Sequence, residues 1–383
     1  MDRPQSPWLE EAELLSRIEQ ARRASLAWLD SLQQAGAPRG VCRISAAHDP
    51  QRWPGVLLPG TYNAVLARAL IGGLSGWLAQ ERTALARWML GHRLADGVFR
   101  VPGMTDATVF KKPDLAETWR YIDFHITNYS LGALEVLGHE ATPVLDFAEP
   151  WLEPLVLKAW LAERDLRDPW QEGNNIVNLG SFLLLRARHG DATDRVRVDA
   201  CLRVLFEWHD RLQEPATGFW GVGQASDPLR ALHAMAGSMH NFHLWYACGR
   251  PLAFQDRAVD WALGRSPTTD SACIDVDLVD LLVHAHGLIA HRRADIERWL
   301  AALLPRLLDL QQADGGFPDV TAGVRRQDGW VGGYEEPQGL SNTFSTWFRW
   351  IAIAMIADLF WPGRWPWVFR SMVGIGYRRP RES

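Results

Sequence analysis

The feature that most limits the fold of this chain is a helical hydrophobic period that recurs along nearly its whole length. Apolar residues fall at intervals of three and four in the segments 198–206 and 296–308, which places them on one face of a helix. Strict alternation of apolar and polar residues, the pattern of a half-buried strand, is nearly absent. The sequence therefore predicts an all-α protein.

The helical pattern is not divided by a long linker, so we predict a single domain over residues 1–383. It should begin with a helix over about residues 8–35. It should end with a tail rich in Trp and Arg over about residues 361–383. Such a tail either packs across the last helices or makes a peripheral contact with a membrane, because Trp and Arg favour membrane interfaces.

A turn recurs between the helical segments at residues 92–99, 212–221 and 310–317, each with Gly after Asp or Thr and an aromatic residue soon after. Helices with a polar beginning also recur, marked by Asn63, His125, Asn175, His240, Asp277 and Asn342. The spacing of these markers leaves room for an inner helix, an outer helix and two loops. This predicts an (α/α)6 toroid with a cavity at the N-terminal ends of its inner helices. An open solenoid of helical hairpins is the alternative.

Composition narrows the class of protein further. Twenty Trp residues suit a cavity with aromatic walls, although a Trp-rich core is the simpler explanation. The net charge of -5 argues against nucleic acid as a partner. The four cysteines are scattered without a C-x-x-C pair, and the first residues lack the pattern of a signal peptide. We therefore expect a cytoplasmic location.

Residues 308–317, Leu-Asp-Leu-Gln-Gln-Ala-Asp-Gly-Gly-Phe, resemble the Q-x-x-D-G-G-F/W repeat of the terpenoid cyclase and protein prenyltransferase superfamily. The turns at Asp96-Gly97 and Thr217-Gly218 are weaker copies. The resemblance covers roughly residues 60–360 and implies an (α/α) toroid in which a Gln and an aromatic residue tie successive helices together. It says less about the reaction, because unrelated chemistry uses the same ring.

Residues 273–280, Cys-Ile-Asp-Val-Asp-Leu-Val-Asp, are similar to the D-x-D-D motif of class II terpene cyclases. The resemblance implies that Asp277 protonates an alkene or epoxide, with Asp275 as its partner. Asp280, three residues further on, is a candidate supporting carboxylate. Protonating a carbon–carbon double bond needs a strong acid in a dry pocket, and aromatic walls stabilise the cation.

This match departs from the motif at its fourth position, where Leu278 stands in place of Asp or Thr. The structural alternative is that Asp275 caps the helix while Asp277 lies in its first turn.

The remaining polar helix starts are candidates for binding a small isoprenoid substrate. The substrate-binding residues that we predict are His125, Asn175, His240, His243, Tyr246, Asn342 and Trp347. We predict no metal and no cofactor, except Mg²⁺ if the substrate carries a diphosphate. A zinc site like that of the prenyltransferases is the less favoured reading of Cys273, Asp275, His284 and His286, since Cys and Asp occur here in reverse order.

Carbohydrate chemistry is the rival function, because hydrolases, lyases and epimerases also use toroids with Trp residues and paired carboxylates. The carboxylates available for it are Asp96, Asp123, Asp275, Asp277, Glu335 and Glu336. His240, His243 and Tyr246 would suit a lyase or epimerase, which removes a proton next to a carboxylate. A toroid that binds a peptide or glycan without catalysis is the third interpretation.

Overall fold

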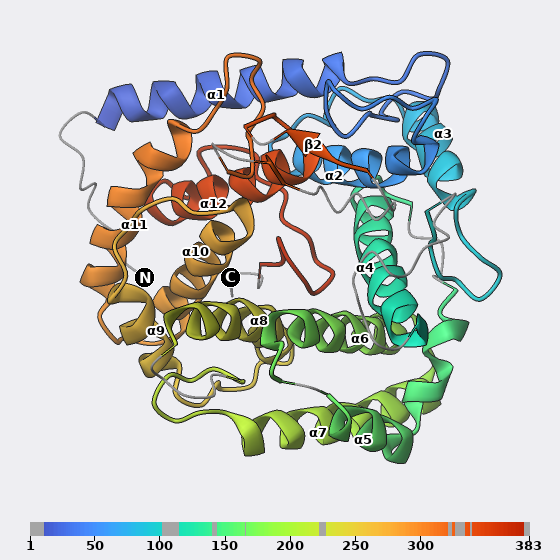
Figure 1. Ribbon diagram of the computed structural model, residues 1–383, viewed down its shortest axis with the longest axis vertical. Coiled ribbons are helices and arrows are strands. Elements are labelled where there is room, and N and C mark those ends of the chain that lie inside the picture. The colour runs from blue at the N-terminus through green and yellow to red at the C-terminus, as the bar shows by residue number, and fades with distance from the viewer. Residues whose placement is uncertain are drawn as a thin grey trace.

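The computed structural model describes residues 11–101, 115–139, 144–164, 166–221, 227–320, 324–325, 334–337 and 339–378 (Figure 1). Six long helices are α2 (Leu57–Leu70), α4 (Leu115–Val136), α6 (Pro169–His189), α8 (Pro228–Ala247), α10 (Ala272–Leu288) and α12 (Thr343–Phe360). One further helix precedes each of them in sequence: α1 (Glu11–Ser31), α3 (Ala79–Leu90), α5 (Pro154–Ala162), α7 (Ala192–Leu212), α9 (Gln255–Leu263) and α11 (Arg293–Leu308). In the described part of the chain, 3-10 helices span Pro54–Val56 and Asp146–Leu152, and a short antiparallel ladder joins β1 (Val324–Arg325) to β2 (Glu336–Pro337). The predicted all-α class is confirmed.

The even-numbered helices contact one another in chain order, from α2 to α4 and onward to α12, and α12 contacts α2. These contacts therefore close into a ring. The odd-numbered helices lie outside it, with α1 beyond α12 and α2, and α7 and α5 beyond α8 and α6 (Figure 1). This arrangement agrees with the predicted inner and outer helices. The finer assignment to the (α/α)6 toroid stays a prediction.

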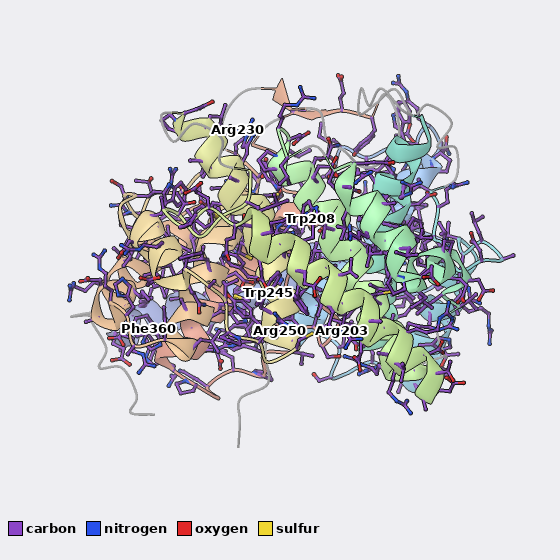
Figure 2. The ribbon with its side chains drawn as sticks, turned by 90° about the horizontal axis from the view of Figure 1, so that it is seen from below. Arg203, Trp208, Arg230, Trp245, Arg250 and Phe360 are labelled. Carbon is purple, nitrogen blue, oxygen red and sulfur yellow. The ribbon has the colours of Figure 1, made fainter. Side chains whose placement is uncertain are left out.

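Inner and outer helices differ in how much of their surface is buried. In α12 nearly every residue is buried, as expected of a helix that is apolar all round. In α7 the buried residues form one face, which includes Phe206 and His209. Trp245 of α8 lies behind α7 in Figure 2, and its ring is 4.6 Å from that of Phe206 and 5.1 Å from that of His209. This aromatic cluster joins the outer helix to the ring.

The link between each loop and the next inner helix is repeated four times. A backbone N–H donates to a Thr or Ser hydroxyl near the beginning or middle of the helix. The pairs are Cys42 to Thr61 (3.1 Å), Phe99 to Thr127 (2.9 Å), Trp220 to Ser238 (2.8 Å) and Phe317 to Thr346 (2.9 Å). These bonds satisfy buried loop N–H groups and fasten the loops to the inner helices. The repeat thus has a structural basis beyond the letters of the turns.

The three predicted turns share a left-handed glycine. Gly97, Gly218 and Gly315 have φ of 102°, 74° and 96°, a region that favours glycine. A Cβ at Gly315 would lie 2.4 Å from the carbonyl oxygen of Ala24 in α1. A Cβ at Gly218 would likewise lie 2.5 Å from the carbonyl oxygen of Phe254. Each turn therefore packs its backbone directly against the next outer segment.

Two glutamines strengthen these turns. Gln213 Nε2 donates to the carbonyl oxygens of Gly218 (2.8 Å) and Ala253 (2.9 Å). Gln311 Nε2 lies 2.9 Å from the carbonyl oxygens of both Gly315 and Ala21. Each of these amides thus joins its own turn to a neighbouring outer segment.

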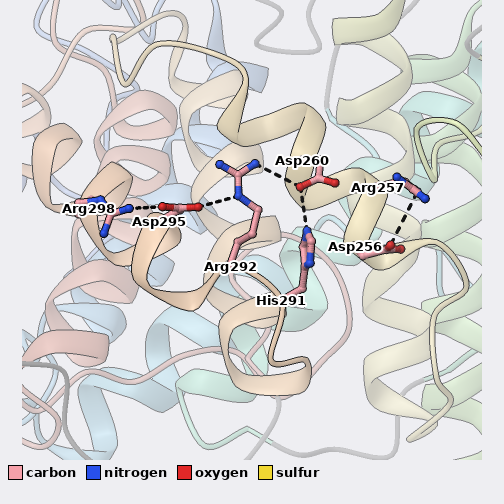
Figure 3. A network of polar contacts seen from close by, with 7 residues as sticks. All are labelled: Asp256, Arg257, Asp260, His291, Arg292, Asp295 and Arg298. Carbon is pink, nitrogen blue, oxygen red and sulfur yellow. Dashed lines mark hydrogen bonds and ion pairs between the residues drawn. The ribbon is translucent and has the colours of Figure 1, made fainter.

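A surface network of polar contacts joins α9 to α11 (Figure 3). Asp260 of α9 accepts from His291 Nε2 at 2.8 Å and from Arg292 at 3.2 Å, and Arg292 also pairs with Asp295 at 2.7 Å. Because these groups are partly exposed, water screens them and they add little to stability. The network orients the outer helices and lies outside the ring.

The first helix ends earlier than predicted, and the tail returns toward the inner helices. The first helix, predicted over about residues 8–35, runs over Glu11–Ser31, and residues 8–10 lie outside the described part. The tail turns back into the ring after α12 (Figure 1). The Val373 carbonyl oxygen accepts from Ser181 Oγ of α6 at 2.9 Å, and Arg370 Nη2 donates to Asn128 Oδ1 of α4 at 2.7 Å. The tail therefore occupies the middle of the ring.

The Trp side chains at the start of the tail point into the protein. Trp361 and Trp365 are buried and donate their indole N–H groups to Glu11 and Glu19 of α1. Packing across a neighbouring helix therefore accounts for these two residues. Contact of the tail with a membrane stays a prediction.

Candidate active site

The polar beginnings of α10 and α12 are held by capping side chains. Ser271 Oγ accepts from the N–H of Ile274 at the start of α10, and Asn342 Oδ1 accepts from the N–H of Ser345 at the start of α12. The cap of α10 is thus Ser271, so the alternative in which Asp275 caps this helix is wrong. Asn342, predicted to bind substrate, serves as the cap of α12.

Two His–Asp pairs connect α8 to α10, one helical turn apart. His240 Nε2 lies 3.1 Å from Asp277 Oδ1, and His243 Nε2 lies 2.9 Å from Asp280 Oδ1. Both carboxylates are completely buried. The two pairs form because residues three apart on each helix share a face, and the facing helices are in register.

The first pair leaves one carboxylate oxygen unused. Asp277 Oδ2 is buried and has no hydrogen-bond partner among the described residues. Burial raises the pKa of Asp277, and this effect outweighs the charge and hydrogen bond of His240, which lower it. On its other side, His240 Nδ1 contacts Asn174 Oδ1, so this nitrogen carries a hydrogen. Asp277 is therefore a buried acid that shares a proton with an oriented imidazole.

The second pair is extended by a third group. His284, one turn after Asp280 in α10, brings its Nδ1 to 2.7 Å from Asp280 Oδ1. Burial alone would raise the pKa of Asp280, but His243 and His284 outweigh it and lower the pKa. Tyr246 stacks on the His284 ring with centroids 4.6 Å apart. Asp280 is thus an ionised carboxylate between two imidazoles.

Asp275 is held on another side of α10. It is ion-paired with Arg349 of α12, and both side chains are buried. Its Oδ1 also accepts from the N–H of Asp270 at 2.8 Å. These contacts give Asp275 a structural role between two inner helices, in contrast to the partnership with Asp277 that the motif implied.

His125 joins the polar groups of α6. Its Nδ1 lies 3.2 Å from Asn178 Nδ2, and burial lowers the pKa of His125 to about 3. The charge of His240 acts on it in the same direction, so His125 is neutral at physiological pH. Its ring is 4.9 Å from Tyr121 and 5.4 Å from Tyr129. His125 therefore lies between the polar groups of the ring and an aromatic wall.

That aromatic wall extends over three inner helices. Tyr129 of α4 lies 5.6 Å from Tyr62 of α2 and 5.3 Å from Trp347 of α12, measured between ring centroids. Trp347 is therefore packed among other aromatic rings in this wall.

Asn175, another predicted binding residue, is fully buried, and its Nδ2 donates to Glu172 Oε2 at 3.4 Å.

The remaining sequence candidates lie apart from the two pairs. Asp123 is ion-paired with Arg100, and Asp96 Oδ1 accepts from the N–H of Val98 in its turn. Glu335 is exposed, whereas Glu336 is buried and accepts from Tyr334. The residues considered for a prenyltransferase-like zinc site do not come together. His286 is hydrogen-bonded to Glu297, and Asp275 is paired with Arg349, whereas His284 contacts Asp280 of the second pair.

Sequence reasoning missed two groups that organise the site. Asn174 sets the orientation of His240, although the prediction named its neighbour Asn175. Arg349 is a single charge inside the apolar run of α12, and such a charge is almost never buried without a partner. That run was the signal that could have identified Arg349 as the partner of a buried carboxylate.

Comparison with models of known protein families and with curated protein sequences found no match. Among the described residues, the helices are too short or too polar for any of them to cross a membrane. The case for function therefore rests on the site itself.

Proposed function

We propose that this protein is an enzyme that starts a cation cyclisation of an isoprenoid by protonation, with Asp277 as the acid. The observation that carries this proposal is the state of the Asp277 carboxyl. It is fully buried, one oxygen contacts His240, and the other is without a hydrogen-bond partner among the described residues. Burial favours the protonated form, which is the form that can deliver a proton.

In the proposed mechanism a protonated His240 makes Asp277 a stronger acid. The contact of Nδ1 with Asn174 leaves Nε2 to face Asp277 Oδ1. If Nε2 donates to Oδ1, the acidic proton resides on Oδ2, and the positive charge nearby favours its loss. The proposal thus requires the acidic proton on Oδ2, the oxygen that faces away from the imidazole.

In the proposed reaction the proton moves from Asp277 Oδ2 to one carbon of an alkene, and a new C–H bond forms. The other carbon becomes a tertiary cation, which the next double bond attacks to close a ring. Loss of a proton from the last cation completes an isomerisation with no net change in atoms. Tyr62, Tyr129 and Trp347 supply π-faces that stabilise positive charge, although their reach to the substrate belongs to the proposal.

The test compares Asp277→Asn with the wild-type protein on farnesyl and geranylgeranyl diphosphate in D₂O. Wild-type protein should give a cyclic product with one deuterium and should release no diphosphate, since protonation replaces ionisation of the ester. Asp277→Asn keeps the shape but cannot donate a carboxylic proton, so turnover should fall about 10²–10⁴-fold or more. The matched control is Asp199→Asn, an exposed carboxylate on α7, which should retain full activity.

Full activity of Asp277→Asn, or products without deuterium, would refute the proposal. Release of diphosphate at the rate of cyclisation would assign the reaction to ionisation of the ester instead. Circular dichroism of both variants separates a lost acid from a lost fold.

The rival is a lyase or epimerase acting on a uronate-containing glycan. It is favoured by Arg100, whose partly exposed guanidinium sits on Asp123 at α4, because Arg suits recognition of a sugar carboxylate. Formation of an unsaturated uronate, followed by its ultraviolet absorbance, would support this function. Binding of a glycan without turnover would support the non-catalytic interpretation.

A further inference from the structure

We propose that His243, Asp280 and His284 bind one divalent transition-metal ion of the zinc type, between α8 and α10. The three side chains are buried, and each can bring one ligand atom within 4.8 Å of the other two. This inference does not depend on the proposed function. The ion would lie one helical turn beyond the His240–Asp277 pair.

The geometry requires only a small expansion. Asp280 Oδ1 lies 2.9 Å from His243 Nε2 and 2.7 Å from His284 Nδ1. Around a tetrahedral Zn²⁺ with bonds of about 2.1 Å, neighbouring ligand atoms are about 3.4 Å apart. The two contacts therefore need to open by about 0.5 Å and about 0.7 Å, which rotation of the side chains can provide.

Both helices hold these ligands rigidly. Asp280 and His284 are one turn apart on α10, and His243 projects from α8, which contacts α10. The His284 ring stacks on Tyr246 at an interplanar angle of 14°, and Tyr246 OH is 3.4 Å from Gln255 Nε2. Ligands fixed in this way lose little freedom when they bind an ion.

The donor set selects the class of metal. Two imidazoles and one carboxylate suit Zn²⁺ and its neighbours in the first transition row, whereas Mg²⁺ and Ca²⁺ prefer oxygen ligands. Asp280 Oδ2 is buried and has no hydrogen-bond partner among the described residues, and the same holds for His284 Nε2. A cation beside the carboxylate would offset the cost of that unpaired oxygen.

The depth of the cluster indicates a structural ion that fastens α8 to α10. His243 and Asp280 are completely buried, and the ring of Tyr377 from the tail lies 5.8 Å from that of His243. A fastening at this height would fix the register that also brings His240 to Asp277. The ion would thus act on the first pair through the positions of the helices.

The experiment uses the full chain without an affinity tag, stripped with a chelator and dialysed against Zn²⁺ or Co²⁺. We expect one ion per chain by mass spectrometry of the metal content, and a visible absorption band with Co²⁺. His284→Gln and Asp280→Asn should each weaken binding by about 100-fold or more in competition with a chelator. The matched control, His286→Gln, alters a neighbouring histidine that bonds Glu297, and its affinity should equal that of the wild type.

Metal uptake by the wild-type protein tests the proposal even if a variant fails to fold. A metal-stripped wild-type chain that remains folded by circular dichroism and takes up no Zn²⁺ or Co²⁺ would overturn the proposal. Uptake that is equal in His284→Gln and the wild type would show binding elsewhere on the chain, and would overturn it as well.

Discussion

Replacing Arg349 with Met tests how the inner helices α10 and α12 are held together. Arg349 is 1 % exposed and is ion-paired with the equally buried Asp275. Its Nη2 also donates to the carbonyl oxygens of Asp270 at 2.9 Å and Asp319 at 2.7 Å. Removing one partner of a buried ion pair leaves an uncompensated charge and typically costs about 3–5 kcal/mol. We expect Arg349→Met to lower the free energy of unfolding by this amount at pH 7.

The effect should depend on pH in a defined direction. Burial raises the pKa of Asp275 to about 6, although Arg349 opposes this, so the carboxyl is ionised above pH 6 in the wild-type protein. Without Arg349 its pKa in the folded state rises further, and the carboxyl stays protonated there while it is ionised in the unfolded chain. The folded state then binds more protons, so the stability of the variant falls by about 1.4 kcal/mol per pH unit. The wild-type carboxyl is half protonated at pH 6, so wild-type stability itself falls by about 0.4 kcal/mol between pH 6 and pH 8. The difference between variant and wild type should therefore grow by about 2.3 kcal/mol over this range.

Urea denaturation at pH 6, 7 and 8 measures this, with Arg306→Met on the exposed face of α11 as the control. The double variant Asp275→Asn/Arg349→Met carries no carboxyl at this position and should lose the added pH dependence. A destabilisation below about 1 kcal/mol at pH 7, or one that is constant from pH 6 to pH 8, would refute the reasoning.

Three further variants, two in the last repeated turn and one at the end of α10, are measured by thermal or urea unfolding. Gly315→Ala forces a side chain into a left-handed backbone with its Cβ 2.4 Å from the Ala24 carbonyl oxygen, and should cost about 2–3 kcal/mol. Gly287→Ala, in the last turn of α10 with open space around it, should instead stabilise by about 0.4–1 kcal/mol. Gln311→Ala removes the amide that joins the turn to α1 and should cost about 1–2 kcal/mol, and equal stability to wild type would show that the Gln does not fasten the turn.

The sequence by itself determined the features that depend on near neighbours in the chain. The period of three and four in segments such as 296–308 identified helices, because a helix places those residues on one face. Glycine after Asp or Thr identified the turns, because glycine adopts the left-handed backbone there without strain. The D-x-D pattern drew attention to Asp277 through its resemblance to the acidic motif of class II terpene cyclases.

Only the tertiary structure decided which of these residues meet. His240 and Asp277 were both named from the sequence, yet their contact depends on the register between α8 and α10. Asp275 and Asp277 are two residues apart, and the helix directs them to different partners, Arg349 and His240. A helical period shows which face is buried but carries no information on how far one helix slides along its neighbour.

The tail is the clearest case of a feature that depends on distant contacts. Its composition fitted either a membrane surface or packing across the last helices. In the structure Val373 accepts hydrogen bonds from Ser181 and Asn128, residues that precede it by 192 and 245 positions. Such contacts depend on the assembled ring of helices, because the tail supplies partners to buried polar groups of α4 and α6. Local sequence pattern therefore set the elements, and the requirement to satisfy buried polar groups set their arrangement.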